Sequence, residues 1–270
     1  MSITVRPTLD ELGRDLLRIS TRKLIVSLLL PFLFVAGYVA FACSDYWSLA
    51  VGCVIALSFV TYGSISHDLV HRSLDLPRWL NDLLLSVIEL LLFRSGRAYR
   101  LAHLNHHAVY PELNNDPEAT AAHGTFWAAL MSGPLFFLRL WWWAIHRYPA
   151  HKARLLFEAA AILCLALASI LAASVGLSIL PVVYLSLAYL GGWIVPLVTA
   201  YIPHNPHGKN ELTQTRRFRG WVVRLIALDH LYHLEHHLFP SVPHHRWPDL
   251  ARRLDPYLDR AGVHPVKLWH

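Results

Sequence analysis

The chain has 270 residues, of which 55% are hydrophobic and 16% charged, and its mean hydropathy is +0.37. This composition excludes an ordinary soluble domain, because the apolar residues are gathered into runs long enough to cross a membrane. The net charge of +6 comes from Lys and Arg in the connecting stretches, which favours a membrane surface and an acidic partner over nucleic acid. We therefore predict a single membrane domain over residues 1–270.

The N-terminal part is predicted to be a lead-in followed by a transmembrane hairpin. Residues 1–23 are rich in charged residues and lack an apolar core, so we expect a cytoplasmic segment. Hairpin 1 covers residues 24–66, with spans over 24–43 and 46–66, each close to the ~20 residues that a bilayer helix needs. Ser44 and Asp45 are the only polar link, and such a short link makes the two helices antiparallel neighbours.

Residues 67–154 are predicted to form a His-rich cytoplasmic and interfacial region. His67 and His71 form an HxxxH pattern at the end of the second span, which places both on one face of a helix. An HxxHH pattern follows at His103, His106 and His107. The apolar stretches 79–93 and 126–143 are short or interrupted by charged residues, Gly and Pro, so we expect interfacial or re-entrant helices there.

The C-terminal half repeats this organisation. Hairpin 2 covers residues 155–203, with spans over 155–175 and 179–202, and a His-rich cytoplasmic region covers 204–270. A second HxxHH pattern lies at His233, His236 and His237. Lys and Arg flank one end of each hairpin and are absent from both tips, so both termini and the His-rich face should be cytoplasmic. The predicted fold is an all-α, multi-pass integral membrane protein with four transmembrane helices in two hairpins, interfacial helices, and a cytoplasmic His-rich cap holding a dimetal site.

The His patterns indicate the chemistry of that site. Eight histidines in these three patterns exceed what one metal ion can use, so two ions are the economical interpretation. Imidazole nitrogens without thiolates suit a metal that changes oxidation state while it binds oxygen, which favours iron. Zinc often replaces iron in overexpressed His-rich proteins, so a zinc-filled site would not identify the native ion.

These motifs carry a family resemblance. HxxxH, HxxHH and HxxHH between paired hairpins resemble the signature of the membrane fatty acid desaturase and hydroxylase superfamily. The stretches HLNHHAVYPELNNDPE, AYIPHNPH and YHLEHHLFPSVPHHRWPDL resemble the carotenoid ring hydroxylases of the cyanobacterial type. The resemblance implies two iron ions, O2 as co-substrate, and a further ligand at His204, with His207 as the fallback. Ala200 stands where animal acyl-CoA desaturases have an Asn that holds a metal-bound water, so the animal substrate pocket is not transferred.

The predicted site has no catalytic residue separate from the metal ligands. Asp68, Asn105, Asp116 and Glu235 are candidates for orienting the imidazole rings, with helix capping or surface charge as the alternative. His207 and His230 are reserve ligands. The nine predicted metal ligands are His67, His71, His103, His106, His107, His204, His233, His236 and His237.

The preferred function is O2-dependent oxidation of C–H bonds in a lipid-soluble substrate at a diiron site. Carotenoid ring hydroxylation, or ketolation, is the first candidate, and fatty acyl-lipid desaturation is the alternative. A non-catalytic membrane metal carrier is a minor alternative, because the predicted spans are almost free of the ionisable groups that transport needs. No flavin, haem or Fe–S motif is present, so a soluble electron donor such as ferredoxin is expected, docking at Arg216, Arg217 and Arg219.

Overall fold

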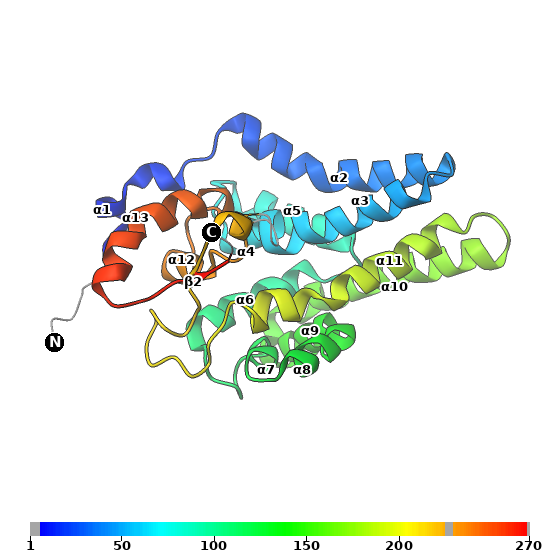
Figure 1. The fold of residues 1–270 in the computed structure, drawn as a ribbon. Coiled ribbons are helices and arrows are strands. Elements are labelled where there is room, and N and C mark those ends of the chain that lie inside the picture. Colours follow the sequence, from blue (N-terminus) through cyan, green and yellow to red (C-terminus); the bar gives the residue numbers. More distant parts are fainter. Residues whose placement is uncertain (1–5, 225–228, 269–270) are drawn as a thin grey trace.

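The computed structural model describes residues 6–224 and 229–268 and is almost entirely helical. Two long helical hairpins run side by side, and the short His-bearing helices gather at one end of them (Figure 1). The predicted all-α fold is confirmed. The α-helices are α1 (Leu9–Leu12), α2 (Thr21–Cys43), α3 (Trp47–Val60), α4 (Ser66–His71), α5 (Arg78–Leu90), α6 (Gly96–Val109), α7 (Ala119–Ala122), α8 (Phe126–Met131), α9 (Phe136–Arg147), α10 (Lys152–Ser174), α11 (Leu180–Trp193), α12 (His233–Leu238) and α13 (Trp247–Arg260).

Shorter elements complete the chain. Two π-helical segments continue the spans α3 and α11 toward the His-bearing end, and a parallel pair of two-residue strands joins distant parts of the C-terminal region. These elements are the π-helices η2 (Thr61–Ile65) and η5 (Leu197–Tyr201), the 3-10 helices η1 (Arg14–Leu17), η3 (Gly133–Leu135), η4 (Pro149–His151), η6 (Trp221–Arg224) and η7 (His244–Arg246), and the strands β1 (Phe218–Arg219) and β2 (Val266–Lys267).

The two hairpins pack closely because small residues lie where their helices meet. A Cβ atom added at Gly37 of α2 would lie 3.0 Å from the Sγ atom of Cys53 on α3. Between the hairpins, a Cβ atom at Gly191 of α11 would lie 2.5 Å from the Oγ atom of Ser58 on α3. Membrane helices gain stability by such close backbone approach, since lipid supplies no hydrophobic driving force between them.

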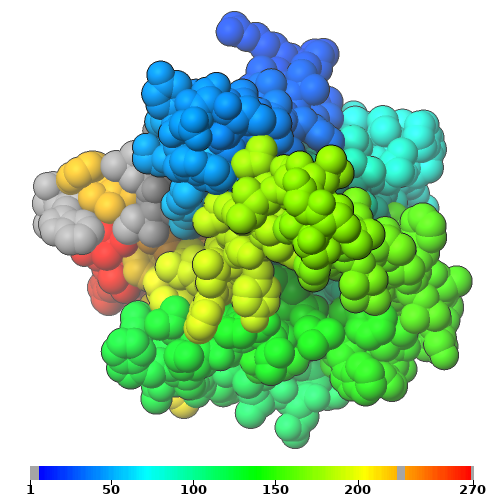
Figure 2. Space-filling model, turned by 90° about the vertical axis from the view of Figure 1, so that its right-hand side faces the viewer, coloured from blue at the N-terminus to red at the C-terminus, as the bar shows by residue number. Residues whose placement is uncertain are grey.

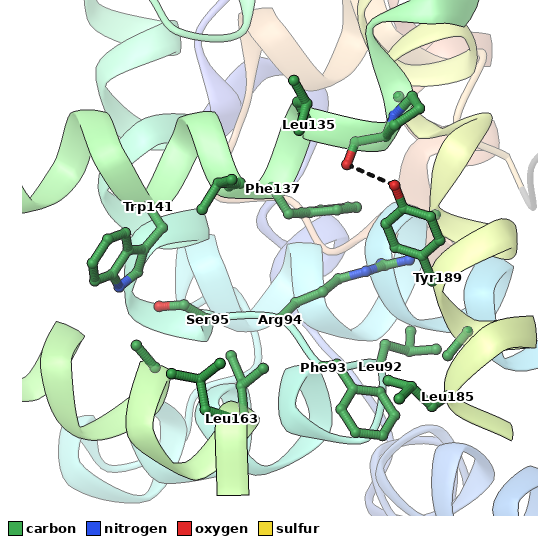
Figure 3. A pocket seen from close by; sticks show the side chains of 17 residues that line it. Leu92, Phe93, Arg94, Ser95, Leu135, Phe137, Trp141, Leu163, Leu185 and Tyr189 are labelled. Carbon is green, nitrogen blue, oxygen red and sulfur yellow. Dashed lines mark hydrogen bonds between the residues drawn. The ribbon is translucent and has the colours of Figure 1, made fainter. Parts of the chain in front are cut away.

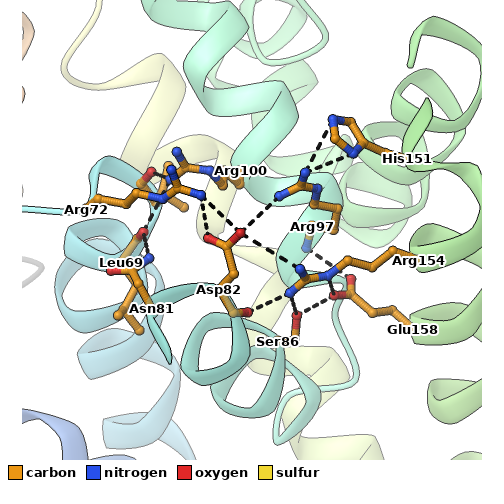
Figure 4. Close-up of polar contacts among 11 residues, drawn as sticks. Leu69, Arg72, Asn81, Asp82, Ser86, Arg97, Arg100, His151, Arg154 and Glu158 are labelled. Atoms are coloured by element: carbon orange, nitrogen blue, oxygen red, sulfur yellow. Dashed lines mark hydrogen bonds and ion pairs between the residues drawn. The ribbon is translucent and has the colours of Figure 1, made fainter. Parts of the chain in front are cut away.

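Helices α5 and α6 form a third, shorter hairpin that inserts beside α10. Several of its charged side chains form ion pairs and hydrogen bonds with each other and with neighbouring elements (Figure 4). Asp82 forms ion pairs with Arg72 at 2.9 Å, with Arg97 at 3.4 Å and with Arg154 at 3.8 Å. The Glu158 carboxylate accepts hydrogen bonds from the Ser95 hydroxyl at 2.6 Å and from the Arg97 backbone N–H at 3.0 Å. The inserted hairpin is therefore fixed to α10 by buried polar contacts.

We expect Glu158→Ala to lower the apparent midpoint of thermal unfolding in detergent by about 6–12 °C. The substitution removes one partner of a buried network, which costs about 3 kcal/mol, and each kcal/mol shifts the midpoint by about 2–4 °C in a chain of this size. Glu112→Ala is the matched control, because Glu112 is exposed. Equal melting curves for the two variants would contradict the role given to Glu158.

The C-terminal cap places α13 over α1 and α12, around a core that includes Leu16, Leu234 and the fully buried Trp247. Arg217 is only 4% exposed and forms ion pairs with Asp255 and Asp259 in this cap.

The three arginines of the predicted docking surface, Arg216, Arg217 and Arg219, form contacts within the fold. The Arg219 guanidinium is paired with Glu235 at 2.5 Å, and Arg216 donates to the backbone carbonyls of Tyr201 and Ile202. Because all three side chains are committed to internal contacts, a charge reversal there would disturb the fold and would not report on docking.

Five helical stretches among the described residues are long and apolar enough to cross a membrane: Arg14–Cys43, Trp47–His71, Phe126–Arg147, Pro149–Ser174 and Leu180–Tyr201. Four of them overlap almost completely with the predicted spans 24–43, 46–66, 155–175 and 179–202. The additional stretch, Phe126–Arg147, is broken by η3 into α8 and α9, and the 12 residues of α9 rise only about 18 Å against a hydrocarbon core of about 30 Å.

Candidate metal centre

The predicted ligands are carried by four short segments that meet where the hairpins end (Figure 1). His67 and His71 lie on α4, three further histidines lie on α6, and the last HxxHH pattern forms α12. His204 follows the π-helix η5, as α4 follows the π-helix η2. Single-turn π-helical segments are rare and frequent at functional sites, and here both precede a predicted ligand.

The structure divides the nine histidines into two groups. His67, His71, His103, His107 and His236 form the first group, and His106, His204, His233 and His237 form the second. In each group one nitrogen atom from every residue lies within 4.8 Å of the others. The arrangement therefore offers five nitrogen ligands at one position and four at another.

Each HxxHH pattern is shared between the two groups. On α6 the i and i+4 residues, His103 and His107, belong to the first group, and the middle residue His106 belongs to the second. On α12 His233 and His237 belong to the second group, and the middle residue His236 belongs to the first. The two helices thus exchange their middle histidines, which holds the two groups next to each other.

The Nε2 atoms converge at short distances. The Nε2 atom of His106 lies 2.9 Å from that of His204, and the Nε2 atom of His236 lies 2.7 Å from that of His107. Two nitrogen ligands at adjacent positions of an octahedral ion, each about 2.1 Å from the metal, lie about 3.0 Å apart. The observed spacing therefore fits imidazoles that surround a common ion.

The hydrogen bonds of His106 and His204 show why a cation fits between their rings. The Nδ1–H of His204 donates to the Ala200 carbonyl at 2.8 Å, and the Nδ1 atom of His106 lies 2.6 Å from the Asp116 carboxylate. With both Nδ1 protons used in this way, both Nε2 atoms of the neutral rings present lone pairs. Two lone pairs facing each other repel, whereas a metal ion between them accepts both.

Burial keeps most of these rings neutral. It lowers the pKa of His103 to about 3, with the neighbouring His106 adding to the effect. Burial and the surrounding imidazoles also hold the pKa values of His204 and His236 well below the usual range. For His106, burial lowers the pKa, but the charge and hydrogen bond of Asp116 outweigh it and the net pKa is raised. Neutral imidazole is the form that binds metal ions.

Two carboxylates orient the ligand rings of α6. Asp116 lies 2.6 Å from the Nδ1 atom of His106, and Glu118 lies 3.0 Å from the Nδ1 atom of His103. Both carboxyl side chains are buried. Asp116 was among the predicted partners. Glu118 was missed, although the sequence offered a signal for it: it follows Asp116 by two residues in the same NNDPE stretch.

Three of the candidate partners, Asp68, Asn105 and Glu235, contact other groups in the structure. Asp68 binds the Nδ1 atom of His244 at 2.6 Å, because the loop before α13 folds over α4. The amide of Asn105 donates to the Asn115 carbonyl at 2.7 Å. Glu235 pairs with Arg219 at 2.5 Å.

The two reserve ligands lie outside both groups. His207, the fallback for His204, is exposed, whereas His204 itself belongs to the second group. His230 is buried, and its ring centroid lies 4.7 Å from that of His233 and 6.1 Å from that of His67. It therefore lies next to the site, beside His233, but belongs to neither group.

The site also constrains how often the chain crosses the membrane. The Nε2 atoms of His106 and His204 are 2.9 Å apart, so an even number of crossings must separate these residues. Three candidate spans, Phe126–Arg147, Pro149–Ser174 and Leu180–Tyr201, lie between them. If α10 and α11 both cross, the broken stretch Phe126–Arg147 does not, which favours the four-span prediction and an interfacial or re-entrant position for α8 and α9.

Comparisons with known proteins agree with this architecture. A family model described as fatty acid desaturase matches residues 44–269, a range that includes all nine histidines. The sn-1 oleoyl-lipid 12-desaturase of Anabaena variabilis is 28% identical to the chain over 131 residues. The match covers 40% of this chain and 37% of the relative, so it spans well under half the length of that protein.

Proposed function

Since this chain belongs to the fatty acid desaturase family, we propose that it is an O2-dependent, diiron oxidoreductase that oxidises a C–H bond in a lipid-soluble substrate. The observation that carries the proposal is the convergence of nine histidines into adjoining groups of five and four. Their nitrogen-rich, thiolate-free set fits two iron ions. When bound, such a pair of ions supplies the oxygen-activating chemistry that unactivated C–H bonds require.

The finer proposal is carotenoid ring hydroxylation, with ketolation as a variant. It is supported by the stretches that resemble carotenoid ring hydroxylases, because these stretches contain the ligands and also the groups that orient the ligand rings. The stretch around NNDPE provides Asp116 and Glu118, which contact His106 and His103. The stretch AYIPHNPH provides both His204 and the carbonyl of Ala200 that orients it.

Acyl-lipid desaturation is the second candidate, and one finding favours it: the relative from Anabaena variabilis is described as an oleoyl-lipid desaturase. Hydroxylation and desaturation both begin with the oxidation of a C–H bond, and the outcome depends on how the substrate carbon is held. The ligand set is therefore compatible with either reaction.

The protein's own residues hold and shield the site. Asp116 and Glu118 fix the orientation of two ligand rings, and His204 is fixed by the Ala200 carbonyl. Six of the nine predicted ligands are buried: His67, His103, His106, His204, His233 and His236. Such burial excludes bulk water and strengthens the interactions of the polar groups inside.

A substrate route leads from the membrane toward the site. A small cavity of about 30 Å³ is lined by residues of α3, of α11 and of the segments that follow these helices, among them Tyr62, Val195 and Val198, and by His230. Its lining is mainly apolar. We propose that this crevice widens to admit one end of a lipid-soluble substrate.

The orientation and the electron donor are part of the same proposal. Basic residues flank the His-bearing ends of the spans, so these ends and both termini face the cytoplasm. Electrons come from a soluble donor such as ferredoxin, which must use a surface other than Arg217 and Arg219, since these arginines are bound inside the fold.

The test is to load the purified protein anaerobically with iron, supply a reduced ferredoxin system and O2, and offer β-carotene or an oleoyl-lipid. We expect β-carotene to gain oxygen, as measured by mass spectrometry. Loss of two hydrogen atoms from the oleoyl chain would select the desaturase alternative. If the iron-loaded protein converts neither substrate under conditions in which it reduces O2, the substrate class proposed here is wrong.

A further inference from the structure

A second cavity lies within the span region, away from the histidines. It has a volume of about 490 Å³ and is bounded by α9, α10, α11 and the turn between α5 and α6. Figure 2 shows the surface hollowed between the yellow-green second hairpin and the green residues below it. The volume lies within the range of about 300–1,000 Å³ that is typical of small-molecule sites.

The lining of this cavity is apolar apart from one arginine. Phe137, Trp141, Leu163 and Leu185 line its walls, and Arg94 extends along its floor beneath Phe137 and toward Tyr189 (Figure 3). The Cζ atom of Arg94 lies 4.1 Å from the centre of the Phe137 ring. The guanidinium thus forms part of the wall of a cavity that is otherwise suited to a hydrocarbon chain.

Arg94 is buried without a direct polar partner for its outer nitrogen atoms. The residue is 4% exposed, and among residues 6–224 and 229–268 neither Nη1 nor Nη2 has a hydrogen-bond partner. Glu89 on α5 is close enough to act on it electrostatically. The described residues nevertheless include no ion pair between the two.

The depth of Arg94 makes this arrangement costly. A Cβ atom on Gly192 would lie 3.1 Å from the Arg94 Nη2 atom, so the guanidinium contacts α11 at Gly192. That glycine is near the middle of the stretch Leu180–Tyr201. A charged side chain at the depth of the bilayer centre is costly, and such residues usually mark a binding site or pathway.

We propose that this cavity, defined by Arg94 and its apolar walls, binds a single-chain fatty acid, with the carboxylate on the Arg94 guanidinium and the chain along Phe137 and Leu163. A guanidinium matches a carboxylate by two parallel, charge-assisted hydrogen bonds. The ligand's charge would offset that of Arg94, and its chain would fill the apolar space. The inference does not depend on the proposed oxidation reaction.

Two observations favour a fatty acid over a phospholipid. A phospholipid keeps its phosphate at the headgroup level, whereas Arg94 contacts Gly192, which lies near the middle of the stretch Leu180–Tyr201. The rim of the cavity also faces the surrounding lipid, because Leu135, Leu138, Leu163 and Tyr189 are each more than half exposed. A single chain can therefore enter laterally from the bilayer.

The experiment measures equilibrium binding of radiolabelled oleate to the detergent-purified, metal-loaded protein. We expect Arg94→Gln to weaken oleate binding at least about tenfold, the size of effect typical for hydrogen bonds to a charged group. Arg94→Lys, which keeps the charge but not the bidentate geometry, should have an intermediate affinity. Arg147→Gln is the control, because Arg147 is exposed on α9 and lies outside the cavity lining.

A second variant guards against misfolding of Arg94→Gln. Ala159→Phe fills the cavity from α10 and leaves Arg94 in place, so it too should weaken oleate binding. Unlabelled methyl oleate, which has no carboxylate, should compete poorly with oleate. The proposal is overturned if wild-type protein binds no oleate, if Arg94→Gln binds it as tightly as wild type, if methyl oleate competes equally, or if only phosphatidic acid competes.

Because binding is the readout, failure of this proposal is distinguishable from failure of the proposed function. A protein that hydroxylates β-carotene but does not bind oleate would retain the diiron function and lose the Arg94 site. A protein that binds oleate through Arg94 but oxidises neither substrate would do the reverse.

Discussion

Replacing His236 with Ala is expected to abolish turnover and to lower the iron content from two ions per chain to one or fewer. The His236 Nε2 atom lies 2.7 Å from that of His107, and its ring centroid lies 4.2 Å from that of His67. Truncation therefore removes a nitrogen atom from the centre of the five-histidine group. The loss should exceed the 10–100-fold effect that is typical of outer partners of a metal ligand.

The measurement is iron content by mass spectrometry together with substrate turnover, both after anaerobic iron loading. His264→Ala is the control, because His264 is exposed and belongs to neither histidine group. We expect it to keep both ions and full activity. His233→Ala should lose iron from the other group, so that the two variants differ in which ion is lost. Full iron occupancy in His236→Ala would contradict the assignment of ligands.

Replacing Asp116 with Asn is expected to weaken iron binding or activity about 10–100-fold without removing a ligand. The Asp116 carboxylate lies 2.6 Å from the Nδ1 atom of His106, and both side chains are almost completely buried. An amide carries no negative charge, so it makes the imidazole a weaker electron donor, and it orients the ring less firmly. The expected result is a smaller loss than in His236→Ala, and a recovery of activity at higher iron concentration.

Iron affinity is measured by titration of the metal-free protein, with turnover followed in parallel. Asn105→Ala is the matched control from the same region, since the Asn105 side chain contacts the Asn115 carbonyl and no ligand ring. Wild-type iron affinity in Asp116→Asn would show that the buried carboxylate only supports the loop. Equal losses in Asp116→Asn and Asn105→Ala would point to general disturbance of this region.

Several candidate side chains contact partners that the sequence did not indicate. Asp68 and Glu235 are adjacent in sequence to predicted ligands, but each contacts a residue that the folded chain brings from elsewhere, His244 and Arg219. Proximity along a helix places neighbouring side chains on different faces, so it gives no information about such partners. The internal contacts of the Arg cluster were not foreseen for the same reason, because pairing with Asp255 of α13 cannot be read from a run of basic residues.

The amino-acid sequence alone determined the local features of this protein. Hydrophobic runs with short polar links predicted the two long hairpins, which appear as α2 with α3 and α10 with α11. The HxxHH spacing predicted histidines on shared helical faces, because residues i, i+3 and i+4 follow the helical period. Both kinds of pattern depend on interactions between residues close in sequence, so they could be read without the fold.

Only the tertiary structure decided how the histidines are divided. His106 joins His204 while its sequence neighbour His107 joins His236, a residue 129 positions away. Adjacent positions on a helix are separated by about 100°, so neighbouring rings can face different ions, and which ion each one faces depends on how α4, α6 and α12 pack together. The place of Arg94 inside an apolar cavity was decided in the same way, since α9, α10 and α11 reach it only when the hairpins have assembled.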